Sequence, residues 1–100
     1  MPIWKLAPIL TSVSDSAWAY SRWFGPAVVR AGNPARARQI AAEAFRKAQE
    51  YENEPAALES PWLNEELVGC QRVAVSTFPP QGPDFLLQPH VTEYRRATGP

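Results

Sequence analysis

The chain has 100 residues, of which 45% are hydrophobic and 20% charged, with 10 basic residues against 10 acidic ones. This length fits a single domain with one modest core, and the apolar fraction excludes wholesale disorder. A formal charge of zero disfavours a polyanion binder that works through bulk charge, and no apolar run approaches the ~18 residues of a membrane span. We therefore expect one soluble domain without a membrane partner.

Two segments in the first third of the chain have the pattern of β-strands. Residues 3–7 are largely apolar and lie between Pro2 and Pro8, which predicts an edge strand, because proline cannot donate to a ladder. Residues 27–31 contain β-branched side chains and predict a second strand. An additional strand over 17–23 would place three side chains on one face: Trp18, Tyr20 and Arg22.

One amphipathic helix is predicted from Pro34 to about Tyr51. Asn33 is suited to cap its first turn, and proline is favoured at the first helical position, where no N–H partner is needed. The predicted buried face has helical spacing and is mostly alanine, so the helix should lie close against a sheet. Its members are Ala37, Ile40, Ala41, Ala44, Phe45, Ala48 and Tyr51.

The second half predicts a short helical turn at 60–62 and a strand over 67–75, with 85–87 docked on the core. The order strand, strand, helix, strand predicts an α+β fold. Its small, mainly antiparallel sheet would have three to four strands, packed by one main helix in ββαβ order. Residues 1–90 would form this single domain, and 91–100 a flexible tail.

The inventory of reactive groups is poor, which argues against catalysis. The chain has one histidine, His90, in a proline-rich segment, and one cysteine, Cys70, among apolar residues. Zinc would need about four nitrogen or sulfur ligands, and no phosphate-cradling glycine loop is present. We therefore expect a non-enzyme with no metal or cofactor. A lone cysteine and the absence of a convincing signal peptide favour the cytoplasm.

Charge is distributed unevenly along the chain. Residues 1–47 carry a net charge of +5 and residues 48–100 a net charge of −5. Basic side chains occupy the first turns of the predicted helix, where the helix dipole prefers anions. Glu50 and Glu52 lie at its predicted end, where the dipole prefers cations. An anion or nucleic-acid site at the helix start would use Arg30, Asn33, Arg36 and Arg38. Two alternatives stay open: these arginines pair with acids of the second half, or they are simply solvated. The acids in question are Glu52, Glu54, Glu59 and Glu65.

An aromatic segment lies just before the second predicted strand. Aromatic and arginine side chains are enriched at the centres of protein interfaces, and core packing is the alternative use of the same rings. We predict a non-catalytic protein-interaction or adaptor domain, with an unidentified protein partner or a second copy, and a sheet edge that takes part. The candidate surface consists of Trp18, Tyr20, Arg22, Trp23 and Phe24.

Several short motifs along the chain indicate a family resemblance. They include Met1-Pro2-Ile3-Trp4, Val29-Arg30-Ala31, Ser60-Pro61-Trp62, Leu67-Val68 with Cys70, and Gly82-Pro83 before Pro89. In these motifs the chain resembles a family of small uncharacterised bacterial proteins that open with Met-Pro-Ile-Trp. The resemblance implies a compact bacterial α+β domain, and it brings no assigned activity, cofactor or catalytic residue.

Overall fold

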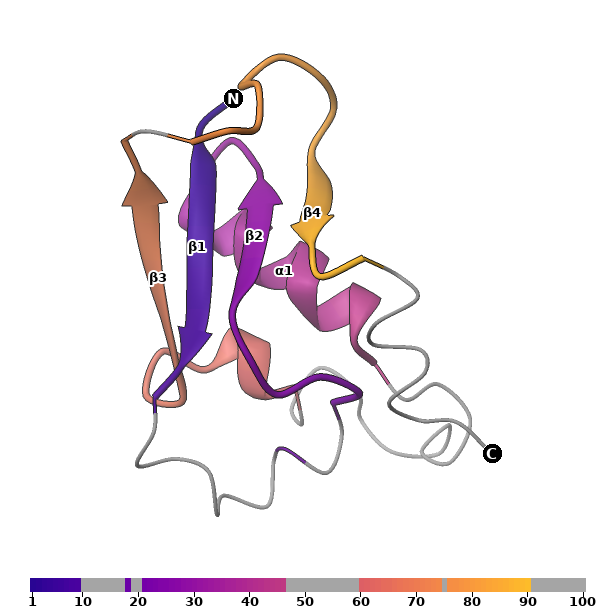
Figure 1. Ribbon diagram of the computed structural model, residues 1–100. Helices are drawn as coiled ribbons and strands as arrows, with labels where there is room; N and C mark the ends of the chain where they lie inside the picture. The colour runs from indigo at the N-terminus through magenta and orange to yellow at the C-terminus, as the bar shows by residue number, and fades with distance from the viewer. Residues whose placement is uncertain (10–17, 19–20, 47–59, 75, 91–100) are drawn as a thin grey trace.

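The sheet has four antiparallel strands in the order β3-β1-β2-β4 (Figure 1). The computed structural model describes residues 1–9, 18, 21–46, 60–74 and 76–90. The strands are β1 (Ile3–Pro8), β2 (Ala27–Arg30), β3 (Val68–Val73) and β4 (Phe85–Gln88). The predicted fold class, a small antiparallel sheet with one helix, is confirmed. The fourth strand is β4, the segment expected only to dock on the core. Trp18, expected in a strand over 17–23, instead forms a turn in which its carbonyl accepts from the Ser21 N–H.

Strand β1 lies between β2 and β3, so the prediction that its flanking prolines place it at an edge is wrong. The Pro2 carbonyl accepts a hydrogen bond from the Ala31 N–H at 3.1 Å. The even-numbered residues of β1 therefore direct their backbone N–H and C=O groups toward β2. The N–H that Pro2 lacks would have met the Ala31 carbonyl, and Trp4 Nε1 donates to that carbonyl instead at 2.9 Å. Pro8 extends past the paired residues of β2, so its missing N–H interrupts no bond there.

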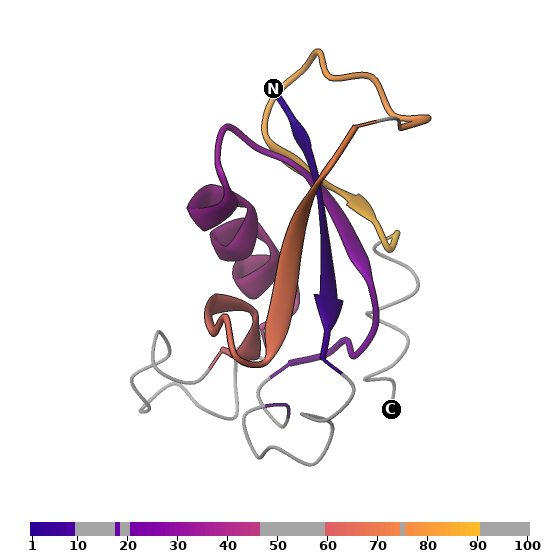
Figure 2. The ribbon, with the colours of Figure 1, turned by 90° about the vertical axis from the view of Figure 1, so that its left-hand side faces the viewer.

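Helix α1 (Pro34–Ala44) covers one face of the sheet (Figure 2). Asn33 adopts extended backbone angles, and its Oδ1 accepts a hydrogen bond from the Arg36 N–H at 2.8 Å, which confirms the predicted N-cap. Ala37 and Ala41 are completely buried, and their small side chains let the helix approach the strands closely. None of the helices in the described residues is long and apolar enough to cross a membrane.

The helix ends at Ala44, well before the predicted end near Tyr51. Phe45 leaves the helical conformation, with φ −99° and ψ 5°, and Arg46 forms an antiparallel bridge with Ser21. The Arg22 N–H donates to the Phe45 carbonyl at 2.7 Å. This long-range pairing takes the backbone groups that another helical turn would use. Of the residues predicted to lie at or near the helix end, Ala48, Glu50, Tyr51 and Glu52 lie outside the described part of the chain.

The core lies between α1 and the sheet and is closed at one end by the short 3-10 helix η3 (Pro61–Leu63). This helix confirms the turn predicted at 60–62. Trp62 and Phe45 are completely buried, with ring centroids 5.0 Å apart. Trp62 Nε1 donates to Ser21 Oγ at 2.9 Å, so the indole of the largest core side chain has a partner for its donor.

Replacing Asn33 by alanine should destabilise the fold by about 1 kcal/mol, because the Arg36 N–H loses its side-chain acceptor. Urea denaturation should show a lower midpoint with an unchanged slope. Asn33→Asp keeps a side-chain acceptor and is the matched control, expected to stay close to the wild type. Equal midpoints for the alanine variant and the wild type would contradict the capping role.

Candidate interaction surface

Arg30 is not available to an anion site at the helix start. The residue is buried, with 8% of its surface exposed. Its Nε donates to the Pro83 carbonyl at 2.8 Å and its Nη1 to the Pro79 carbonyl at 2.9 Å. A Cβ on Gly82 would lie 2.8 Å from Arg30 Nη2, and Gly82 has φ +120°. The guanidinium therefore holds the loop before β4 and leaves room only for glycine there.

The other members of the predicted anion cluster point to different partners. Arg36 Nε makes an ion pair with Asp84 Oδ2 at 2.8 Å, and this carboxylate raises the pKa of Arg36. Arg38 Nη1 donates to the Trp62 carbonyl at 3.3 Å. Of the acids predicted as alternative partners, Glu52, Glu54 and Glu59 lie outside the described residues, whereas Glu65 lines the same pocket as Arg38. Asn33 and Arg38 thus share one surface, while Arg30 and Arg36 make their contacts at the loop before β4.

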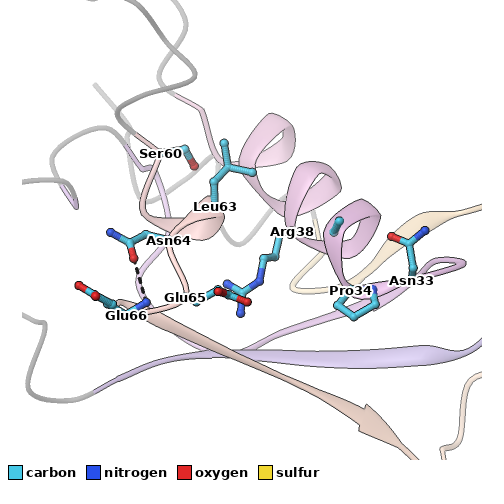
Figure 3. A pocket seen from close by; sticks show the side chains of 9 residues that line it. Asn33, Pro34, Arg38, Ser60, Leu63, Asn64, Glu65 and Glu66 are labelled. Carbon is cyan, nitrogen blue, oxygen red and sulfur yellow. Dashed lines mark hydrogen bonds between the residues drawn. The ribbon is translucent and has the colours of Figure 1, made fainter.

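A groove of about 870 Å³ lies between the start of α1 and the segment that runs from η3 to β3 (Figure 3). Arg38 lines it from the helix, while Glu65 and Glu66 line it from the turn before β3. Because both signs of charge line the groove, its electrostatics select no simple anion. Its other lining residues are Asn33, Pro34, Ala35, Ser60, Leu63 and Asn64.

The predicted aromatic surface is divided between the core and the exterior. Trp18 and Trp23 are half-buried and pack against the core, with the Trp18 and Trp62 rings 5.6 Å apart edge to face. Phe24 is 43% exposed and meets the Trp18 ring at 4.6 Å. Arg22 is half-buried, and its Nε has no hydrogen-bond partner among the described residues. Tyr20 lies outside the described part of the chain.

The single cysteine of the chain is a poor nucleophile, and the described residues hold no cluster of three metal ligands. Cys70 is half-buried on β3, and burial raises the pKa of its thiol despite the opposing charge of Arg38. The thiol is therefore protonated at neutral pH and a weak nucleophile. Among the described residues, no three histidine, cysteine, aspartate or glutamate side chains gather as metal ligands.

The two outer strands of the sheet, β3 and β4, differ in length and in the regularity of their pairing. Strand β3 has six residues and pairs with β1 in an unbroken register from Ile3–Val73 to Pro8–Val68. Strand β4 has four residues, its register with β2 shifts between Val28 and Val29, and prolines lie near both of its ends. Short, irregular, proline-flanked strands resist further pairing. In the described part of the chain, β3 is therefore the better-formed open edge.

Hydrogen-bond alternation identifies the groups that β3 presents outward. The Ile9 N–H donates to the Leu67 carbonyl at 2.8 Å. The odd-numbered residues of β3 therefore direct their backbone N–H and C=O groups toward β1. The N–H and C=O groups of Cys70 and Arg72 consequently point away from the sheet. The backbone groups of Val68 also point away from the sheet, but its N–H already donates to the Asn64 carbonyl at 3.0 Å. Figure 1 shows no described strand beyond β3.

The sequence missed this edge because local patterns do not give strand order. Proline flanks pointed to β1, whereas β3 has neither proline nor an unusual composition. The exposed Gln71 and Arg72 are the only local signal that this strand lies at an edge. Comparisons with protein-family models, curated proteins and solved structures gave no match to this chain. The resemblance to small bacterial proteins therefore stays a prediction.

Proposed function

We propose that this protein is a non-catalytic protein-interaction domain that binds an extended segment of a partner along β3. The observation that carries the proposal is the open edge itself. Cys70 and Arg72 direct their backbone donors and acceptors outward from a regular six-residue strand. A segment added there would form a fifth strand, with main-chain hydrogen bonds supplying much of the affinity.

The surroundings of β3 give such a partner side-chain contacts. The groove lined by Arg38, Glu65 and Glu66 opens at the start of the strand, because the two glutamates belong to the turn that leads into it. At the other end, Arg72, Ser76 and Phe78 line a second hollow of about 420 Å³. A bound segment that reaches beyond β3 would meet polar and charged side chains at both ends, which favours a partner segment of mixed polarity over an apolar one.

The alternative of anion or nucleic-acid binding has less support. Of the four residues expected to form that site, Arg30 is committed to two loop carbonyls and Arg36 to Asp84. Arg38 shares its groove with Glu65 and Glu66. Among protein-binding surfaces, the aromatic segment is the second candidate, although the packing of Trp18 and Trp23 on the core leaves Phe24 as its most exposed ring.

Selection from a phage-displayed library of random short peptides tests the proposal. Peptides that bind the wild type should lose about tenfold or more in affinity for Arg72→Pro, because proline removes an outward N–H and its ring obstructs the edge. Hydrogen exchange on the wild-type complex should show new protection at the amides of Cys70 and Arg72.

Arg72→Ala is the matched control, because it removes the side chain and keeps the N–H. It should lose clearly less affinity for the same peptides than Arg72→Pro does, and the difference between the two variants measures the contribution of the backbone N–H. Cys70→Pro repeats the block at the other outward position, should the first proline variant fold poorly. Peptides that bind all variants equally and protect neither amide would refute the proposal.

A further inference from the structure

We infer that the partner of β3 is a second copy of this chain, and that the two β3 strands pair antiparallel across a two-fold axis at Gln71. This inference rests on the proposed function of the edge and adds the identity of the partner. The pairing would join two four-stranded sheets into one continuous sheet. A two-fold arrangement uses the same surface on both copies, as most soluble homodimers do.

The outward-facing groups favour one register. A two-fold axis at Gly69 or at Cys70 would pair Val68 with Cys70 or Arg72 inside the strand, and the Val68 N–H already donates to the Asn64 carbonyl. With an axis at Gln71, Val68 lies opposite Ala74, which is beyond the end of β3, so this pair is not needed. An axis at Gln71 instead places Cys70 of each copy opposite Arg72 of the other. Both residues direct their N–H and C=O groups outward, so each such pair can exchange both of its hydrogen bonds. The two Gln71 side chains then face each other in a pair without backbone hydrogen bonds.

The charges at the ends of β3 suit an antiparallel self-pairing. Glu65 and Glu66 are exposed at its start, where the neighbouring Arg38 leaves the acidic charge in excess. Arg72 lines the hollow at its other end. An antiparallel pair therefore brings the acidic end of each strand toward the basic end of its partner, and it places no like charges directly opposite each other. The zero net charge of the chain adds no overall repulsion between copies.

The fold also explains why such pairing would stop at two copies. Joining both β3 strands uses that edge on both copies and leaves only the two β4 edges exposed in the described sheet. Strand β4 is short, its register is shifted, and Pro83 and Pro89 flank it closely. These features disfavour the addition of a further strand. A closed dimer, rather than an open fibre, is the expected assembly.

Sedimentation equilibrium and disulfide trapping on the full chain test the inference. The wild type should show a concentration-dependent dimer, and Arg72→Pro should weaken it by about tenfold or more. In a Cys70→Ser background, Gln71→Cys should cross-link on oxidation, because residues opposite each other in such a pair have Cα atoms ~4.5 Å apart. Arg72→Cys in the same background is the matched control and should not cross-link, because its counterpart lies two residues further along the strand.

A chain that stays monomeric at every concentration and does not trap through Gln71→Cys would overturn the inference. A dimer that persists in both Arg72→Pro and Cys70→Pro would also overturn it, because another surface would then hold the copies. Equal trapping at positions 71 and 72 would overturn the register. If displayed peptides protect the β3 amides while the chain stays monomeric, only this inference fails and the proposed function stands; if neither binding occurs, both fail.

Discussion

Replacing Trp62 by alanine is expected to destabilise the protein by about 3–5 kcal/mol, because it removes the largest of the fully buried side chains. The indole packs against Phe45 and Trp18 at centroid distances of 5.0 and 5.6 Å. Its removal leaves a cavity where η3, α1 and the 21–24 segment meet, and it leaves Ser21 Oγ without the indole donor. A domain of this size has only about 5–15 kcal/mol of stability, so a large fraction would be lost.

Thermal unfolding followed by far-UV circular dichroism measures this effect. Each kcal/mol lowers the Tm of a domain this small by ~4–8 °C, so Trp62→Ala should melt at least ~12 °C below the wild type. Trp62→Phe keeps one aromatic ring but loses the rest of the indole and its Nε1 hydrogen bond, so it should fall between the two. A melting temperature within ~3 °C of the wild type for the alanine variant would show that this tryptophan is not the centre of the core.

Replacing Arg30 by methionine should cost about 2–3 kcal/mol, although the apolar stem is kept. The guanidinium makes two hydrogen bonds, to the carbonyls of Pro79 and Pro83, that methionine cannot replace. These bonds join the end of β2 to the loop that leads into β4. The loop and β4 should therefore lose protection in hydrogen exchange more than β1 or β3 does.

Arg30→Lys is the matched control for this prediction. A single ammonium keeps the charge but lacks the planar fork that reaches two carbonyls at once, so we expect an intermediate loss of stability. If the lysine variant is as stable as the wild type, charge alone holds the loop. If the methionine variant is as stable as the wild type and its β4 amides stay protected, the guanidinium does not hold the loop at all.

Arg30 also shows why the predicted anion site did not assemble. From the sequence, Arg30 lies three residues from the helix cap, within reach of Arg36 and Arg38. In the sheet, Arg30 pairs with Phe85 at the end of β2, and the 79–83 loop reaches its guanidinium. The carbonyls that it binds come from about fifty residues further along the chain, a separation that no local pattern conveys. Arg36 finds Asp84 in the same part of the chain.

The sequence alone determined the features that depend on neighbouring residues. The Asn33 cap, the proline at the first helical position and the alanine face of α1 are local and were predicted correctly, as were β2 and the turn at 60–62. Tertiary structure decided the rest. The bridge from Ser21 to Arg46 coincides with the early end of the helix. The Trp4 indole supplies the donor that Pro2 lacks, so the proline is tolerated beside the central strand β1. The strand order leaves β3 at an open edge. This order depends on pairings between residues far apart in the chain, and local propensity does not encode those pairings.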